Sequence, residues 1–145
     1  MGCTSLTGPD FSNWDVSNVT SFQGMFRSCT NLTETGVNSI AGWDVGSGQN
    51  FQAMLRGVSS VGSLSLIGWD ITSATTFNGF IDAGTIATNR YDALLISWAA
   101  QSFIQNGQTA TFGASTYTGG GAAAAARATL EATKGGWNIS DGGVA

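Results

Sequence analysis

The most regular feature of this chain is a spacing of apolar positions that occurs three times. A Trp-Asp pair is followed by a β-branched residue, by a Phe eight positions after the Trp, and by an apolar pair at eleven and twelve. The three copies run from Trp14 to Phe26, from Trp43 to Leu55 and from Trp69 to Ile81. Successive Trp residues lie 29 and 26 positions apart, which indicates a repeated unit.

The similarity extends beyond these blocks and divides the chain into repeat 1 (about residues 7–32), repeat 2 (33–61) and repeat 3 (62–86). A period in the twenties is typical of leucine-rich-repeat solenoids, in which one unit cannot bury its apolar side without its neighbours. We therefore expect an α/β repeat fold, a short leucine-rich-repeat-like β-solenoid of about three rungs of 26–29 residues. A propeller is disfavoured because each blade needs roughly 40 to 45 residues.

Two kinds of spacing predict the local structure inside a repeat. Around each Trp the apolar residues alternate, so that Ser12, Trp14 and Val16 share one side of an extended segment. From Phe22 to Phe26 the apolar spacing is three and four, which predicts a single helical or 3₁₀ turn. We expect the strands to lie at the Trp-Asp segments.

The chain changes character after residue 88. Asn89 and Asp92 have the spacing of a capping box and predict a helix to about residue 105. A short strand at Thr109–Phe112 and a second helix over 122–134 should follow, because a Gly run precedes that helix and Gly135 ends it. We expect residues 1–88 to form the solenoid and residues 89–145 its cap, within one structural domain.

The last segment, around Trp137, has the same pattern as the start of the third block. Gly136 to Ser140 repeats the pattern of Gly68 to Thr72, with Asn138 in place of Asp70. This match predicts a fourth strand beside repeat 3, which together with the two helices would close the exposed sheet edge.

Several phrases of the sequence resemble one known family. WDVSNVTSFQGMF and CTNLT in repeat 1 are similar to the repeats of BspA-like leucine-rich-repeat surface proteins, in the variant that carries W-D-V-S-N-V-T and a following M-F. The tail, with YDALLISWAAQSF, TATFGASTYTGGG and ARATLEATKGGWNISDGG, resembles the segment that closes many such proteins. The resemblance implies surface adhesion, on a bacterial cell-surface protein or at the receptor-binding tip of a phage tail fibre.

A column of carboxylates is the sharpest candidate for chemistry. Asp15, Asp44 and Asp70 occupy equivalent positions, and stacked carboxylates about 4.8 Å apart repel one another unless something compensates. Each could accept hydrogen bonds from backbone N–H groups of the turn that follows, as Asp does in Asx-turns. Alternatively, oxygen ligands from neighbouring repeats could bind a metal, Ca²⁺ for instance. We favour turn capping and expect no other cofactor.

The aromatic residues at equivalent positions predict a structural ladder, with two interpretations. Rows of exposed aromatic rings bind sugars by stacking, but these Trp residues share a face with aliphatic neighbours, which favours burial in the core. The predicted ladder comprises Trp14, Trp43, Trp69, Trp137, Phe22, Phe51 and Phe77. A third row, with Arg27, Arg56 and Asp82 at matching positions, predicts an ion pair between Arg56 and Asp82.

Composition narrows the functional classes. The chain has 145 residues, with five Lys and Arg, nine Asp and Glu, no His and a net charge of -4, so it lacks the clustered basic residues that bind nucleic acid. Without His, and with acidic residues mostly one per repeat, general acid-base catalysis has little support, and we expect no enzyme. No signal peptide and no apolar run long enough for membrane insertion is visible. We expect an extracellular, cell-surface or virion-surface location.

Two features of the N-terminal region bear on what lies next to it in the folded protein. The phrase Cys3 to Leu6 matches Cys29 to Leu32, so the chain starts within a unit, and we expect a preceding segment or another subunit to cover that side. Cys3 and Cys29 would be adjacent, either as buried free thiols or as a disulfide. Two functions fit: a non-catalytic recognition module for a host-surface protein or glycan, or a self-assembling structural virion component such as a capsid-decoration or tail protein.

Overall fold

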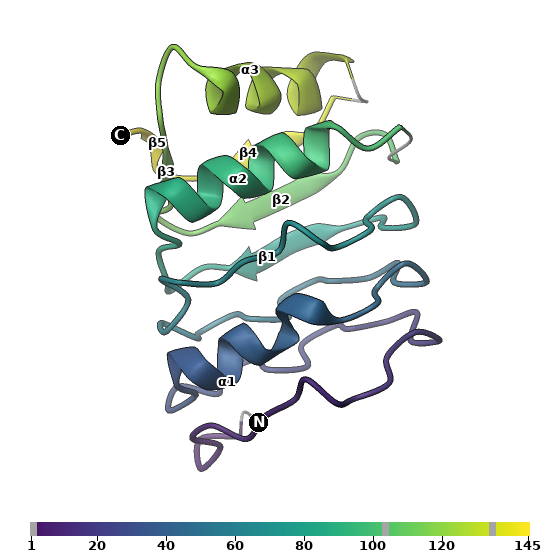
Figure 1. Ribbon diagram of the computed structural model, residues 1–145, viewed down its shortest axis with the longest axis vertical. Helices are drawn as coiled ribbons and strands as arrows, with labels where there is room; N and C mark the ends of the chain where they lie inside the picture. The colour runs from purple at the N-terminus through teal and green to yellow at the C-terminus, as the bar shows by residue number, and fades with distance from the viewer. Residues whose placement is uncertain (1–2, 103–104, 134–135) are drawn as a thin grey trace.

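The computed structural model describes residues 3–102, 105–133 and 136–145. Figure 1 shows the helices at successive levels along the long axis, with the N-terminus towards one end and α3 at the other. Within the described residues the elements are α1 (Glu34–Asn38), a 3₁₀ helix (Ser39–Gly42), β1 (Phe77–Ile81), α2 (Thr88–Ala99), β2 (Thr109–Phe112), β3 (Thr116–Tyr117), α3 (Ala122–Ala128), a π-helical turn (Thr129–Thr133), β4 (Asn138–Ser140) and β5 (Gly143–Val144).

The strands form two small parallel sheets. The larger has the order β1-β2-β4, with Phe77 opposite Ala110 and Ala110 opposite Ile139. The smaller pairs β3 with β5. The strand expected at Thr109–Phe112 is confirmed as β2. The strand expected near Trp137 exists as β4, but it does not lie beside repeat 3, because β2 lies between β1 and β4.

The expected fold class is wrong. We predicted a leucine-rich-repeat-like β-solenoid closed by a two-helix cap and a fourth strand. The described residues instead form a compact α/β domain with three α-helices and few, short strands, all in the two small sheets. The Trp-Asp segments contain no strand, and repeats 1 and 2 have only isolated bridges, from Ser21 to Asn50 and from Asn50 to Thr76.

The second half of each block, which begins at Phe22 in repeat 1, is the segment that pairs between repeats. We had predicted a helical turn there. In repeat 1 the N–H groups of Phe22, Gly24 and Phe26 donate to the carbonyls of Asn50, Gln52 and Met54, at 2.8, 2.9 and 2.9 Å respectively.

Repeat 2 donates to repeat 3 in the same way, with Phe51, Ala53 and Leu55 each bonded at 3.0 Å to a carbonyl in the segment from Thr76 to Phe80. We call these contacts the repeat junctions. In these bonds the earlier repeat supplies the N–H groups and the later repeat supplies the carbonyls. Just before them the direction is reversed, because the N–H groups of Gln49 and Thr75 donate to the carbonyls of Thr20 and Gln49 of the preceding repeat, at 2.8 and 2.7 Å.

Local turns explain why the junctions are not longer strands. In repeat 1 the N–H groups of Met25 and Arg27 donate back to the carbonyls of Phe22 and Gly24, at 3.2 and 3.0 Å. Gly24 has a φ of 63°, a left-handed conformation that interrupts an extended chain. Every second N–H therefore stays within its own repeat, and only the alternate ones reach the neighbour.

The helices also differ from their predicted bounds. No helix was predicted near the start of repeat 2, where α1 lies. The helix predicted from residue 89 to about 105 is α2, which is capped at Ala87 without a side-chain bond and ends at Ala99. Asp92 does not close a capping box, because its carboxylate accepts from the backbone and hydroxyl of Thr118.

The second predicted helix begins at Ala122 as expected and continues beyond Ala128 as a π-helical turn. Its predicted end at Lys134 and Gly135 lies outside the described residues. Within the described residues no helix is long and apolar enough to span a bilayer, since α2, the longest, has 12 residues.

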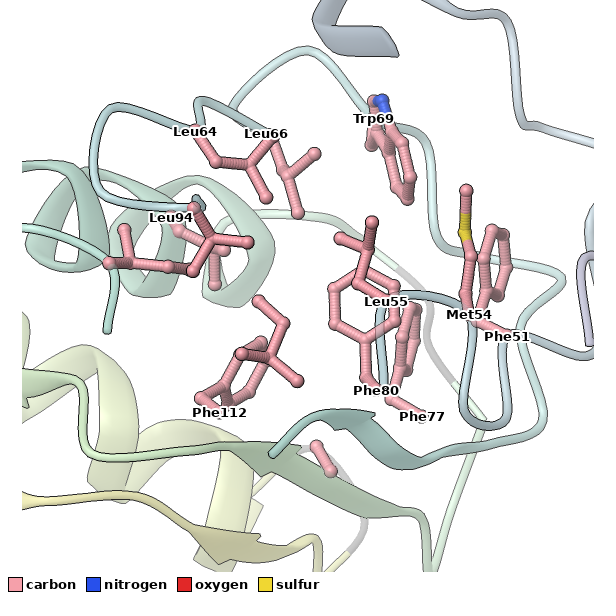
Figure 2. Packing of buried hydrophobic residues seen from close by; sticks show 14 of the residues in the cluster. Phe51, Met54, Leu55, Leu64, Leu66, Trp69, Phe77, Phe80, Leu94 and Phe112 are labelled. Carbon is pink, nitrogen blue, oxygen red and sulfur yellow. The ribbon is translucent and has the colours of Figure 1, made fainter. Parts of the chain in front are cut away.

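One hydrophobic core runs through the molecule, from Phe11 to Ile139 in sequence. Figure 2 shows how side chains of repeats 2 and 3 meet those of α2 and β2, with Leu55 and Phe80 between Leu94 and Phe51 in that view. Phe22 stacks on Phe51 at 5.0 Å between ring centroids, and Phe51 stacks on Phe77 at 4.8 Å. The core therefore joins the repeats to the C-terminal region continuously.

Arg127 of α3 ties the C-terminal segment to the rest of the domain. Its guanidinium contacts the carboxylate of Asp141 at 2.9 Å, that of Glu131 at 2.7 Å and the carbonyl of Ile139 at 3.1 Å. The Tyr91 hydroxyl donates to Asp141 at 2.7 Å. Burial opposes the charge of Arg127, but the hydrogen bond and charge of Asp141, helped by Glu131, outweigh it and raise the pKa of Arg127. Burial, then Asp141, raises the pKa of Tyr91.

Candidate functional site

The three Asp residues of the predicted column each cap their own turn. Asp15 accepts from the backbone N–H of Ser17 at 3.1 Å, Asp44 from that of Gly46 at 3.2 Å, and Asp70 from that of Thr72 at 2.9 Å. The hydroxyls of Ser17 and Thr72 add bonds of 2.7 and 2.6 Å. The hydroxyl of Ser17, followed by its N–H, lowers the pKa of the Asp15 carboxyl.

These carboxylates form no evident metal site. Among the residues that the structure describes, no group of three or more Asp, Glu, His or Cys side chains is arranged to hold an ion. The turns already engage one oxygen of each carboxylate, and these hydrogen bonds stabilise its negative charge. The geometry supports the capping interpretation of Asp15, Asp44 and Asp70.

Trp43 and Trp69 of the predicted ladder follow one hydrogen-bonding rule. The indole N–H of Trp43 donates to the carbonyl of Phe11 at 2.9 Å, and that of Trp69 to the carbonyl of Ile40 at 3.2 Å. Each acceptor lies three residues before the Trp of the preceding repeat. Buried Trp residues need such a partner, and the rule joins each repeat to the one before it.

Trp14 breaks the expectation of a wholly buried ladder. Its ring lies 6.2 Å from that of Trp43 at an interplanar angle of 13°, yet it is 50% exposed, whereas Trp43 and Trp69 are buried. Nothing among the described residues accepts a hydrogen bond from its indole N–H. The prediction that Trp14 packs in the core is wrong, because the described residues place no preceding repeat over its outer side.

The sequence analysis missed one member of the ladder, Trp98. From α2 its indole N–H donates to the carbonyl of Leu66 at 3.2 Å, three residues before Trp69, and its ring lies 4.8 Å from that of Phe77. Trp137 comes next, bonded to the carbonyl of Gln105 at 3.1 Å and 6.4 Å from Trp98. The spacing of 29 residues from Trp69 to Trp98 was the available signal, but no Asp follows Trp98.

Outward-facing polar residues alternate with the buried Phe residues at the repeat junctions. Because side chains alternate between faces in extended segments, the residues on either side of each Phe share the opposite face. All of them are exposed or half-buried. We call this surface the polar face, and it comprises Ser21, Gln23, Asn50, Gln52, Thr76 and Asn78. In the larger sheet, Thr109 and Thr111 of β2, paired with Asn138 and Ser140 of β4, continue it.

The polar face keeps unused hydrogen-bonding groups. The side chains of Asn50 and Thr76 accept from the backbone N–H two residues later, at 2.9 and 3.1 Å. Asn50 also donates to Gln23 at 3.3 Å. Within the described part of the chain, the side-chain amides of Gln52 and Asn78 bond to no protein group. These two amides are free to bind another molecule.

One edge of the polar face carries charge. Arg56 contacts Asp82 at 2.9 Å, which confirms the predicted ion pair, and Asp82 also accepts from the backbone of Gly57 at 2.8 Å. Arg27 occupies the matching position in repeat 1 and is exposed. All members of the polar face itself are uncharged.

A shallow groove of about 400 Å³ lies where repeat 3 meets the end of α2. Its lining includes Ile67, Asp70, Thr72 and Ser97. Gln101 also lines it, but its side chain bonds to the backbone of Trp69 at 2.8 Å and of Ile71 at 3.0 Å.

The two cysteines are free thiols. Cys29 is buried and Cys3 is exposed. Burial raises the pKa of the Cys29 thiol, so it is a poor nucleophile at neutral pH.

Comparison with known proteins adds one family. No curated protein and no solved structure matches the chain. Residues 1–114 match the family described as Mycoplasma protein of unknown function, DUF285, a domain found in BspA-like repeat surface proteins. This match covers all three repeats, α2 and β2. The chain therefore belongs to the DUF285 family.

Proposed function

We propose that this protein is a non-catalytic recognition module at a cell or particle surface, which binds a protein or a glycan through its polar face. The observation that carries the proposal is the row of outward amides and hydroxyls, in which Gln52 and Asn78 have side-chain amides without a partner among the described residues. The occurrence of the family in repeat surface proteins supports the same function.

The chemistry of the polar face suits an uncharged ligand. Amide and hydroxyl groups both donate and accept hydrogen bonds, and they do so without the cost of removing water from a charge. Paired segments about 4.8 Å apart present such groups at a regular interval, which favours an extended ligand with repeating polar groups. A glycan chain and the backbone of an extended protein segment both have this character.

A glycan array provides the test, run with and without Ca²⁺ and followed by binding to intact cells. The triple variant Q23A/Q52A/N78A should lose binding by tenfold or more, because three hydrogen bonds of about 1 kcal/mol each are removed. Ca²⁺ should have no effect, since the turns engage the carboxylates of Asp15, Asp44 and Asp70.

The matched control is N13A/T35A/N89A, which removes exposed polar side chains outside the polar face. Equal binding by the two triple variants would rule out the polar face. Gel filtration with mass measurement tests the alternative of a structural virion component, because a self-assembling oligomer without glycan or cell binding would favour that function over recognition.

A further inference from the structure

The polar face contains one column of residues that crosses the repeats and the larger sheet, with one residue at each of five levels. We call it the polar column, and it comprises Ser21, Asn50, Thr76, Thr109 and Asn138. Isolated bridges pair its first three members, and the register of β2 with β4 pairs its last two. The pairing of Phe77 with Ala110 joins the two halves, because each of these residues directly follows a member of the column. Figure 1 shows β1, β2 and β4 at successive levels.

Every member of the polar column can both donate and accept hydrogen bonds, because each side chain is an amide or a hydroxyl. All five are exposed or half-buried. A second row lies two residues further along the repeats, where Gln52 and Asn78 have side-chain amides without a protein partner in the described part of the chain. The surface therefore presents uncharged hydrogen-bonding groups at each level.

Spacing decides which extended polymer fits along the polar column. Neighbouring levels are about 4.8 Å apart. An extended peptide presents groups on one side at every second residue, about 6.7 Å apart, so it would be about 8 Å out of step after five levels. One ring of a 1,4-linked sugar chain, built from bonds of about 1.5 Å, advances the chain by about 5 Å. A sugar chain therefore stays in step with the column.

A peptide could also lie along a strand, across the column. Residues two apart in one extended segment are about 6.7 Å apart, which matches the spacing of such a peptide. In that orientation, however, the peptide meets only two members of the polar face at one level, such as Asn50 and Gln52. A ligand along the column meets all five levels. The column therefore favours a polymer that runs across the strands.

The shape and charge of the polar column narrow the class of glycan. A β-1,4 linkage between equatorial positions gives an extended ribbon, whereas an α-1,4 linkage curves the chain into a helix. Only the ribbon can keep one edge against all five levels. A glycan with carboxylate or sulfate groups would find no cation in the column, and the net charge of -4 would repel it. A neutral chain is the better match.

We propose that the polar column binds a neutral, extended, β-1,4-linked glycan, which lies across the repeats with about one sugar at each level. This inference rests on the proposed recognition function and narrows its ligand to one class of glycan. The hydroxyls of each sugar exchange hydrogen bonds with the column member at its level, and Gln52 and Asn78 reach the chain from the second row. Because the levels contribute separately, the affinity increases with the number of sugars until the column is filled.

The probes are β-1,4-linked oligomers of glucose and of N-acetylglucosamine, from the dimer to the hexamer, titrated into the intact protein by calorimetry. Each added sugar up to the pentamer should tighten binding by about threefold to tenfold, because it adds about one hydrogen bond. The hexamer should bind within about twofold of the pentamer, since the column has five levels. The matched control is the α-1,4-linked glucose series, in which each added sugar should change the affinity by less than about twofold.

Three results of these titrations would overturn the proposal. They are the absence of binding by both β-1,4-linked pentamers at millimolar concentration, an equal gain per sugar in the α-linked and β-linked series, and a gain from the pentamer to the hexamer as large as the earlier ones.

Two protein variants locate the ligand on the column. S21A/Q23A removes the polar side chains of the first level, so the gain from tetramer to pentamer should disappear. Binding of the dimer should be unchanged, because four levels remain, and this also verifies that the variant is folded. N13A/N89A removes two exposed polar side chains outside the polar face and should keep the full gain. Equal responses of the two variants would contradict the proposed position.

Failure of this inference is distinguishable from failure of the proposed function. If Q23A/Q52A/N78A loses binding to cells or to other glycans while β-1,4-linked oligomers do not bind, the polar face recognises a different ligand and only the inference falls. If that triple variant keeps all binding to the array and to cells, the proposed function falls and the inference falls with it.

Discussion

The two ends of the domain differ in whether their Trp side chains and backbone carbonyls have hydrogen-bond partners. At one end Trp14 is half exposed and three carbonyls of repeat 1 have no donor among the described residues. At the other end Trp137 is buried and bonded, and Arg127 occupies the carbonyl of Ile139. The difference teaches that the backbone and indole groups of a repeat depend on a neighbour on each side. On the C-terminal side of repeat 3, that neighbour is formed by α2 and β2.

The largest expected effect is the loss of stability when a buried Trp is removed, compared with the removal of a half-exposed one. Trp43→Ala should lower the free energy of unfolding by roughly 3 to 5 kcal/mol, because it leaves a cavity between repeats. Trp14→Ala should cost roughly 1 to 2 kcal/mol, since half of its surface is already in water. Urea unfolding followed by circular dichroism measures both. Equal losses would mean that the two ends do not differ in packing.

The next prediction concerns the ion pair between Arg127 and Asp141 at the C-terminal end of the domain. Arg127→Met should lower the free energy of unfolding by roughly 2 to 3 kcal/mol, because it leaves the carboxylate of Asp141, 2% exposed, without its cation. The double variant R127M/D141L should recover part of that loss, since no buried charge is left behind. Thermal unfolding of the three proteins decides this. A double variant no better than Arg127→Met would contradict the burial argument.

A smaller effect is expected for the other ion pair. Arg56→Ala should change the free energy of unfolding by less than about 1 kcal/mol, because Arg56 is 51% exposed and water screens the pair. Asp82 keeps its bond to the backbone of Gly57 in this variant. Urea unfolding in low and high salt gives the measurement. A loss as large as that of Arg127→Met would show that burial does not separate the two pairs.

The smallest expected effect is the pH dependence of stability that Asp15 of repeat 1 contributes. The folded pKa of Asp15 is below its ordinary value, so the ionised carboxylate is the form that the turn stabilises. Its contribution to stability is therefore present above pH about 4 and is lost as the pH falls through the folded pKa. Carboxyl NMR titration should find a pKa for Asp15 below that of an unstructured peptide. Ser17→Ala should move it back, and no response to that change would exclude the hydroxyl as the cause.

Part of the candidate site could be predicted from the sequence. Equal offsets identified Phe22, Phe51 and Phe77 as counterparts, and their rings are in contact. The row that includes Arg56 and Asp82 was found in the same way. The open amides of Gln52 and Asn78 were not singled out, because short-range patterns do not show which side chains the backbone leaves unbonded.

What the sequence by itself determined is which residues are equivalent, because a repeated spacing places the same residue types at the same level of each unit. Only the tertiary structure decided where the strands lie, that Trp98 follows Trp69 from within a helix, and that β2 separates β1 from β4. The physical reason is that pairing and burial depend on the neighbour that each unit meets. A segment with the same local pattern becomes a turn, a bridge or a strand according to the hydrogen bonds which that neighbour leaves open.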